Sequence, residues 1–275
     1  LNGTFGTDAF SAWFPEPIHL TVLAALVAGW MWMRAVRASG ERASVAAEAV
    51  VAGYLGAIAG GRLLGLPIDF AHGRPVFSGL AAFFSGEFVA YGSMIGAFAA
   101  IAVLLRIRRA PMLPYLDALA PAFGVGIALA RVGCFLNGCD YGLRTSLPWS
   151  VRFPAGSGPF RDQVAARAID AGAALSAPVH PTQLYHALSG LAVFAISTWA
   201  LRRPHRRGAV FALAAGAYAA MRFGIEFLRG DVDRGLYAGL STSQWIGLGV
   251  LALLATLAFV RSRHAARAAT PVAEA

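Results

Sequence analysis

The sequence predicts an all-α, polytopic membrane protein with about seven transmembrane helices. Hydrophobic residues make up 57% of its 275 residues and charged residues only 13%, whereas about a quarter of the residues in a soluble domain are charged. Apolar runs recur along the chain, and most approach the roughly 20 residues that a helix needs to cross the hydrocarbon core. The predicted spans cover residues 18–36, 46–66, 88–105, 113–136, 182–201, 208–228 and 242–260.

The positions of the arginines predict the orientation. Clusters of arginine follow the first, third, fifth and seventh spans, so every other connection is basic. The residues are Arg34, Arg37 and Arg42; Arg106, Arg108 and Arg109; Arg202, Arg203, Arg206 and Arg207; and Arg261, Arg263 and Arg267. Because basic connections remain in the cytoplasm, we expect the N-terminus to lie outside and the C-terminus inside.

We expect a single transmembrane domain over residues 1–265, followed by a disordered tail at 266–275. The connection 138–181 is the only long polar segment, and a small cap on the outer side is the interpretation we favour over a solvated loop without a role. The chain begins at Leu1, from which we expect a trimmed N-terminus, and no cleavable signal pattern is visible.

The net charge of +9 comes from 23 basic residues that are all arginine. Such bias is typical of a GC-rich genome, so we expect no nucleic-acid partner and instead an anionic phospholipid of the bilayer. The two cysteines, Cys134 and Cys139, lack the spacing of a zinc site. The two cysteines could bind a metal ion with Asp140 and His180, or they could form a disulfide with each other. We favour the disulfide over the metal site. We expect neither a metal nor a cofactor.

Charged residues within apolar runs are candidate functional residues, because charge in a membrane is costly. Arg131 and Asp140 close the fourth span together with Asn137, and Arg62 follows two glycines in the second. Arg62 could instead have no functional role and simply extend its side chain to the lipid headgroups.

The sixth span ends with Arg222, Glu226 and Arg229, which at i, i+4 and i+7 share one face of a helix. A self-neutralising triplet that locks helices together is the alternative. Arg222 and Arg229 make four arginines with Arg62 and Arg131, against the two glutamates Glu226 and Glu87. This excess of positive charge predicts a pocket for a phosphate-bearing lipid headgroup.

Polar residues also gather where the fourth and fifth spans meet the outer side. His180, Thr182, Gln183 and Tyr185 are expected at the depth of Asp140. A helix cap is as plausible for His180 as a catalytic role. Tyr91 in the third span is, taken alone, more typical of an interfacial aromatic residue.

The stretch 130–142, Ala-Arg-Val-Gly-Cys-Phe-Leu-Asn-Gly-Cys-Asp-Tyr-Gly, resembles the signature of the prolipoprotein diacylglyceryl transferases. Further blocks match that family in the same order over residues 46–260. They are Gly60-Gly61-Arg62, Asp117 to Pro121, Pro148-Trp149, His180 to Tyr185, Arg222 to Arg229 with Asp231, and Leu240 to Gln244. Several ordered blocks are far more specific than one motif.

The resemblance implies an inner-membrane enzyme that moves the diacylglyceryl group of phosphatidylglycerol onto the lipobox cysteine of a preprolipoprotein, recognised with its signal peptide. The implied catalytic residues are Tyr91, Arg131, Asn137, Asp140, Arg222 and Glu226. The implied lipid-binding residues are Arg62, Arg131, Gly142, His180, Gln183, Arg222 and Arg229. Arg131 and Arg222 would stabilise the leaving phosphate, Glu226 would orient Arg222, and Asn137 and Gly142 would shape the pocket.

Three departures from the family pattern leave alternatives open. Tyr91-Gly92-Ser93 replaces His-Gly-Gly, Cys134 and Cys139 replace the first asparagine and the glutamate of the signature, and residues 18–33 lack a Trp-Tyr-Gly pattern. Tyr91, His180 or Asp140 would then accept the proton. The alternatives are a related transferase with another acceptor and a non-catalytic phospholipid-binding paralogue.

Overall fold

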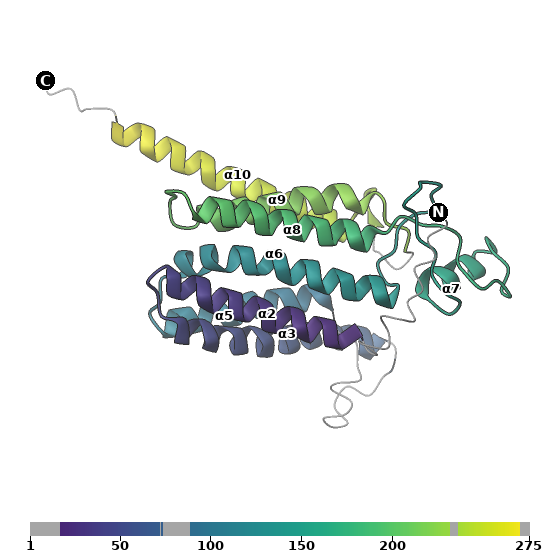
Figure 1. Ribbon diagram of the computed structural model, residues 1–275. Helices are drawn as coiled ribbons and strands as arrows, with labels where there is room; N and C mark the ends of the chain where they lie inside the picture. Colours follow the sequence, from purple (N-terminus) through teal and green to yellow (C-terminus); the bar gives the residue numbers. More distant parts are fainter. Residues whose placement is uncertain (1–16, 72, 74–88, 232–235, 270–275) are drawn as a thin grey trace, which may run out of the picture. The chain divides into compact units, whose positions relative to one another are not determined.

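The computed structural model describes residues 17–71, 73, 89–231 and 236–269 (Figure 1). The chain forms two compact units, one of residues 29–119 and one of residues 1–28 with 120–275.

Within the described residues, each predicted span coincides with one long helix. These helices are α2 (Pro17–Ala38), α3 (Ala43–Ala71), α5 (Ala90–Ile107), α6 (Met112–Asn137), α8 (Thr182–Leu201), α9 (Ala209–Glu226) and α10 (Thr242–Ala269). Five of the described helices are long and apolar enough to cross a membrane. The all-α, polytopic fold class is therefore confirmed.

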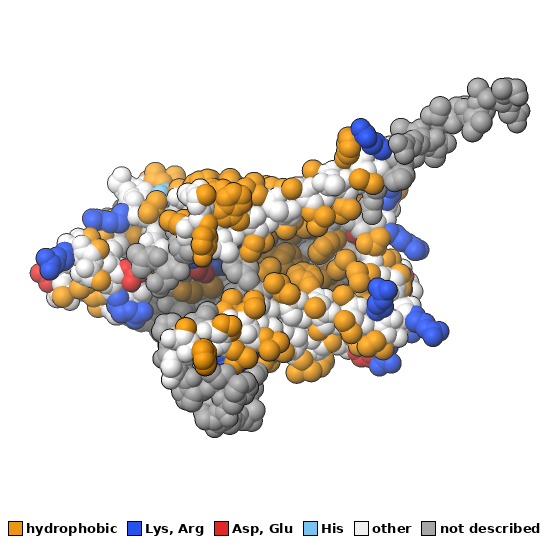
Figure 2. Space-filling view, turned by 180° about the vertical axis from the view of Figure 1, so that it is seen from behind, with side chains coloured by type: hydrophobic (Ala, Val, Ile, Leu, Met, Phe, Trp, Pro, Cys, Tyr) orange, Lys and Arg blue, Asp and Glu red, His pale blue; other side chains and the backbone are white. Residues whose placement is uncertain are grey.

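Apolar side chains are spread over the face of the molecule that Figure 2 shows. Large side chains that would be buried in a soluble protein are more than half exposed, among them Leu26, Val51, Ile95, Leu253 and Phe259. Such extensive exposure of apolar side chains is expected of helices that face lipid.

In the unit of residues 29–119, α3 packs against α5 through glycines. A β-carbon on Gly60 would lie 2.2 Å from the carbonyl oxygen of Gly92, and one on Gly56 would lie 2.3 Å from that of Gly96. Small residues let membrane helices approach this closely. Gly60, noted in the sequence beside Arg62, is therefore a packing residue.

In the other unit, the C-terminal part of α6 and helices α8, α9 and α10 pack together. A β-carbon on Gly124 of α6 would lie 2.6 Å from the carbonyl oxygen of Gly190 on α8. Val193 of α8 and Val210 of α9 belong to one buried cluster. α8, α9 and α10 follow one another in Figure 1 in green to yellow.

The connection 138–181 is a folded segment with its own small core. Tyr141, Val151, Phe153 and Val179 are buried together, and Phe135 of α6 packs against them. Short antiparallel bridges join 144 and 151 to 179, and 154 to 175, and helix α7 (Gly158–Ala165) lies within the segment. The segment is therefore more ordered than a solvated loop.

The structure differs from the sequence prediction at the end of α9, in the connection before α10 and at the end of α10. α9 ends at Glu226, two residues early, and a two-stranded hairpin of β1 (Leu236–Tyr237) and β2 (Leu240–Ser241) precedes α10. α10 extends through residues 266–269, which we predicted to be disordered. Alanine is the strongest helix former and fills most of this stretch, while residues 270–275 lie outside the described part.

Candidate functional site

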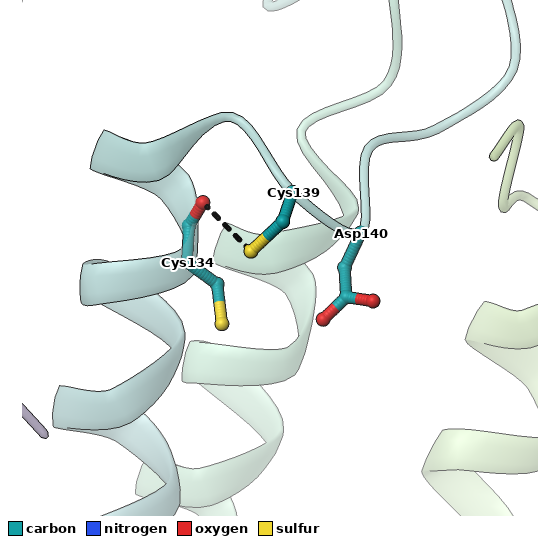
Figure 3. Close-up of side chains that lie close together, drawn as sticks. All are labelled: Cys134, Cys139 and Asp140. Carbon is teal, nitrogen blue, oxygen red and sulfur yellow. Dashed lines mark hydrogen bonds between the residues drawn. The ribbon is translucent and has the colours of Figure 1, made fainter. Parts of the chain in front are cut away.

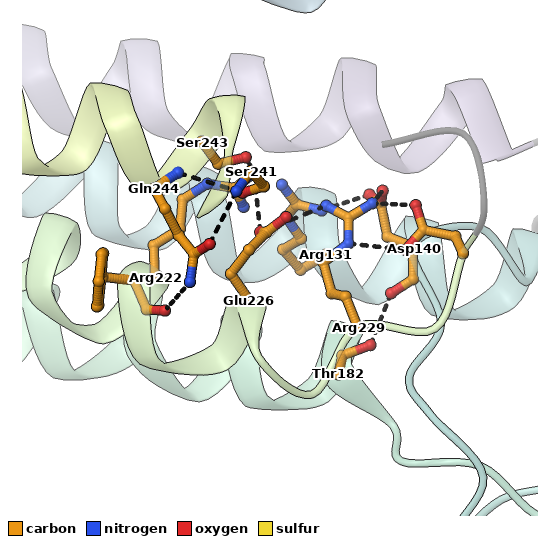
Figure 4. A network of polar contacts seen from close by, with 11 residues as sticks. Arg131, Asp140, Thr182, Arg222, Glu226, Arg229, Ser241, Ser243 and Gln244 are labelled. Atoms are coloured by element: carbon orange, nitrogen blue, oxygen red, sulfur yellow. Dashed lines mark hydrogen bonds and ion pairs between the residues drawn. The ribbon is translucent and has the colours of Figure 1, made fainter. Parts of the chain in front are cut away.

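Three arginines meet carboxylates at one end of the unit formed by residues 120–275 (Figure 4). Asp140 joins two of them: its Oδ2 accepts from Arg131 Nη1 at 2.5 Å and its Oδ1 from Arg229 Nη2 at 2.6 Å. Arg131 lies on α6, whereas Asp140 and Arg229 lie in the segments that follow α6 and α9. The carboxylate therefore ties two separate segments of chain together.

Glu226 continues the network at the end of α9. Its side chain is only 1% exposed, and its Oε2 lies 3.8 Å from Arg222 Nη2 and 3.9 Å from Arg229 Nη1. Arg229 also pairs with Asp231. The chain of charges thus runs from Arg131 through Asp140, Arg229 and Glu226 to Arg222.

This network corrects the expected surplus of positive charge. Arg131, Arg222 and Arg229 are matched by three carboxylates, those of Asp140, Glu226 and Asp231. The comparison of arginines with glutamates in the sequence did not include Asp140 and Asp231. Folding brings them back onto the arginines.

One donor of this network has no protein acceptor among the described residues. Arg222 Nη2 donates a hydrogen bond to Ser243 Oγ at 2.8 Å. The buried Nη1 of Arg222 makes no hydrogen bond within the described part of the chain. A buried donor left unpaired is destabilising by about 1–3 kcal/mol. An oxygen-rich ligand at this position would relieve that penalty.

The start of α10 is fastened to α9 beside Arg222. Gln244 Nε2 donates to the carbonyl of Phe223 at 3.3 Å, and Gln244 Oε1 accepts from the backbone N–H of Ser241 at 2.9 Å. These bonds hold Ser243 where its hydroxyl accepts from Arg222. The block Leu240 to Gln244 therefore positions an arginine.

Asp140 is placed by a turn that α8 holds. The residue has a left-handed backbone with φ of 56°, which aspartate tolerates better than most residues. Thr182 Oγ1 donates to the carbonyl of Asp140 at 2.6 Å, and Gln183 Nε2 donates to that of Cys139 at 2.7 Å. Gln183 thus supports the turn, while its buried Oε1 has no partner among the described residues.

Gly142 allows the chain crossing that brings Asp140 to Arg229. Residues 142 and 229 form an antiparallel bridge, and the backbone N–H of Gly142 donates to the carbonyl of His180 at 3.0 Å. A β-carbon on Gly142 would lie 2.5 Å from that of His180. Arg229 consequently reaches the site from this bridge, and the prediction that it shares a helical face with Arg222 and Glu226 is wrong.

His180 contacts an aromatic pair at the start of α8. Its Nδ1 lies 3.2 Å from Tyr185 Oη, and that hydroxyl accepts from Trp149 Nε1 at 2.8 Å. The helix cap is Pro181, and no side chain caps the helix. The alternative that His180 caps this helix is therefore wrong.

The arginines keep Asp140 ionised. Burial raises the pKa of the Asp140 carboxyl, but the charges of Arg229 and Arg131 outweigh burial and hold its pKa below the ordinary value. Burial likewise lowers the pKa of the Arg229 guanidinium, and its bonds to Asp231 and Asp140 raise it overall. Such a carboxylate is a weak base and a strong anchor for arginine.

The network just described does not include three of the predicted residues. Arg62 belongs to the unit of residues 29–119, where it is 1% exposed and pairs with Asp69. Tyr91 lies in α5, but its side chain falls outside the described part. Asn137 is the exposed last residue of α6, and its amide lies beside the Cys139 thiol.

His186 was not among the residues predicted from the sequence. His186 is fully buried on α8, within electrostatic range of Arg131, Arg222 and Arg229. Neither of its ring nitrogens has a hydrogen-bond partner among the described residues. A polar stripe could have revealed it, because Thr182, His186 and Ser189 recur at helical spacing along an apolar helix.

Cys134, Cys139 and Asp140 form a cluster in which potential metal ligand atoms lie within 4.8 Å of one another (Figure 3). Both carboxylate oxygens of Asp140 already accept from guanidinium groups. A cation here would compete with Arg131 and Arg229 for the same oxygens. The cluster therefore fits a metal ion poorly.

Comparison with known proteins gives one consistent result. A sequence profile of the family described as prolipoprotein diacylglyceryl transferase matches residues 19–260. A protein of Idiomarina loihiensis is 31% identical over 268 residues, which cover 92% of each chain. A protein of Cupriavidus metallidurans is 33% identical over 225 residues, or 79% of this chain and 77% of the relative. One of Clostridium tetani is 32% identical over 201 residues, or 72% and 73%. All three relatives are named phosphatidylglycerol–prolipoprotein diacylglyceryl transferase.

Proposed function

Because this chain belongs to the prolipoprotein diacylglyceryl transferase family, we propose that it transfers the diacylglyceryl group of phosphatidylglycerol to a cysteine thiol of a prolipoprotein. It does so as a multi-pass enzyme of a bacterial membrane. The arginine network of residues 120–275 is the site at which the phosphate of the lipid binds.

The observation that carries this proposal is the buried Nη1 of Arg222, which has no acceptor among the described residues. Phosphate oxygens are strong acceptors for guanidinium groups. Arg222 is held by Ser243 and Glu226 on its other side, so the unpaired donor is aimed by the protein before the lipid arrives. Preorganised donors of this kind stabilise charge that develops during a reaction.

The reaction breaks one carbon–oxygen bond and forms one carbon–sulfur bond. The thiolate of the substrate attacks the glyceryl carbon that bears the phosphate ester, and glycerol phosphate leaves with the negative charge. Arg222 and Arg131 stabilise that charge. Substrate thiol becomes thiolate by losing its proton to a base of the enzyme.

The carboxylates hold the arginines in place. Asp140 and Glu226 anchor Arg131, Arg229 and Arg222, and the lowered pKa of Asp140 argues against its acting as the base. His180 and Tyr91 remain the proposed proton acceptors. Gly142 and Gln183 act through the turn of Asp140, and Asn137 shapes the pocket as one of the proposed catalytic residues. Arg62 is a further proposed lipid-binding residue.

The proposed setting is the cytoplasmic membrane, with the N-terminus in the periplasm and the C-terminus in the cytoplasm. All of the long helices from α2 to α10 then cross the bilayer as seven spans of one domain. The segment 138–181 covers the site on the periplasmic side. There it would meet the signal peptide that carries the lipobox cysteine.

The test uses the purified full chain in vesicles that contain phosphatidylglycerol, with a lipobox peptide as acceptor. The wild type should attach one diacylglyceryl group to the peptide, detected by mass spectrometry. Arg222→Ala should lower the rate by about 100-fold, as loss of one preorganised donor does, and Arg222→Lys should restore little of it. Arg206→Ala, which alters an exposed arginine outside the network, is the matched control and should not change the rate.

Two results would contradict the proposal. Folded wild-type protein that retains phosphatidylglycerol but modifies no peptide would be a binding protein. Equal rates for Arg222→Ala and Arg206→Ala would remove the assigned phosphate site.

A further inference from the structure

The two cysteines of the chain lie close together beside the arginine network, and the proposed reaction does not use them. Cys134 is in the last turn of α6, and Cys139 follows the left-handed residue Gly138, whose φ is 71°. Gly138 turns the chain back, so that the N–H of Cys139 donates to the carbonyl of Cys134 at 3.2 Å. Figure 3 shows the two side chains on the same side of this turn.

The sulfur atoms are within reach of each other. Cys139 Sγ lies 3.6 Å from the carbonyl oxygen of Cys134, and the two sulfurs belong to the cluster with separations below 4.8 Å. A disulfide needs about 2.05 Å, so its formation requires the two side chains to rotate toward each other. Both residues are free thiols and partly exposed in this structure, so a small oxidant can reach them.

The surroundings favour thiolate formation at Cys139. The side-chain interaction with Cys134 lowers the pKa of the Cys139 thiol, against the opposing effect of burial. A thiol with a pKa near the ambient pH is the best attacking group in thiol–disulfide exchange. Cys134 is placed to resolve the mixed disulfide that would form on Cys139.

We propose that Cys134 and Cys139 are a modification site, a dithiol that a disulfide oxidant converts to an intramolecular disulfide. The Cys139 thiolate attacks a sulfur of the oxidant and releases one thiol. Deprotonated Cys134 then attacks Cys139 Sγ and releases the second thiol of the oxidant. Overall, the two cysteine thiols lose two electrons and two protons, and the disulfide of the oxidant is reduced to two thiols. Disulfides form outside the cytoplasm. The inference therefore depends on the proposed function in one respect, the orientation that places these cysteines on the periplasmic side.

The bond would secure the turn that carries Asp140. Asp140 follows Cys139 directly, and its carboxylate holds Arg131 and Arg229. A covalent link between α6 and Cys139 restrains this turn in the unfolded chain as well as the folded one. The oxidised protein should therefore melt several degrees higher than the reduced protein.

The experiment treats purified full-length protein in detergent with oxidised glutathione and then alkylates the remaining thiols. Wild type should lose both alkylation sites without gaining glutathione, and dithiothreitol should restore them. Cys134→Ser and Cys139→Ser should instead retain one bound glutathione, because neither can resolve the mixed disulfide. The gain in melting temperature on oxidation should be absent from both variants.

Alkylation of reduced wild type at different pH values gives a second measurement. Modification of Cys139 should reach half its maximal rate at a lower pH than that of an ordinary thiol, which does so at about pH 8.5. Wild type that keeps two alkylatable thiols or a stable glutathione adduct would overturn the proposal. Neither readout involves lipid transfer, so failure here is distinct from failure of the proposed function.

Discussion

At the scale of single residues, Asp140 is the point on which two arginines depend. Its two oxygens accept from Arg131 and Arg229, so removing the charge takes away the ion pair of Arg131 and leaves Arg229 to Asp231 and Glu226. Asp140→Asn should destabilise the protein by about 1–3 kcal/mol and slow lipid transfer. Thermal unfolding in detergent and the vesicle assay measure the two effects, with Asp170→Asn, an exposed turn residue, as the control.

The pH dependence of this effect has a definite sign. A carboxyl whose pKa is lowered by folding stabilises the protein above its ordinary pKa, about 4, and loses that contribution as the pH falls through the lower folded-state value. The difference in melting temperature between wild type and Asp140→Asn should be constant from pH 7 to pH 5 and narrow below pH 4. A difference that widens in acid would show that Asp140 is not held by the arginines.

Replacing His186 distinguishes a role in folding from a role in ligand binding. Both ring nitrogens are buried and unpaired among the described residues, so an apolar leucine of similar size should leave stability unchanged or raise it. We expect the nitrogens to bind a lipid headgroup. His186→Leu should then keep its melting temperature but lose at least about tenfold in transfer rate.

Ser189→Ala, one turn away, is the matched control for His186, because the Ser189 hydroxyl donates only to the carbonyl of His186 within its own helix. It should preserve both the melting temperature and the rate. Full activity of His186→Leu would leave the histidine without a role in the site.

At the scale of structural elements, the crossing of the 142 and 229 segments decides whether the network forms. Gly142→Ala would place a methyl group 2.5 Å from the β-carbon of His180 and 2.6 Å from its carbonyl oxygen. Overpacking of this kind costs about 1–3 kcal/mol, and here it would also move Arg229 away from Asp140. The variant should lower both the melting temperature and the transfer rate.

Gly224→Ala is the control for this crossing. A β-carbon on Gly224 meets nothing within 4 Å among the described residues, and alanine is the better helix former. This variant should be as stable as the wild type or more so. Equal stability for the two alanine variants would mean that the 142 and 229 segments are not as close as the structure has them.

At the scale of the whole molecule, the arginine clusters predict which connections face the cytoplasm. A reporter that is active only in the periplasm should work when inserted after Gly156, in the segment 138–181. It should be inactive when fused after Arg206, in the basic connection between α8 and α9. A fluorescent protein that folds only in the cytoplasm should give the opposite pattern, and the reverse result would invert the proposed topology.

Much of this architecture followed from the sequence because it depends on local composition. Each predicted span coincided with a helix in the described residues, since a bilayer requires a long apolar run wherever a chain crosses it. Arg131 and Arg222 were recognisable for the same reason, because charge within such a run is rare.

The partners of those arginines were decided only by the tertiary structure. Asp140 and Arg229 are 89 residues apart, and nothing local in the sequence specifies that Gly142 lets their segments cross. His186 escaped notice because its importance comes from the charges that surround it in space. Hydrophobic runs fix where helices form, whereas the pairing of charges depends on which turns and glycines allow distant backbones to approach.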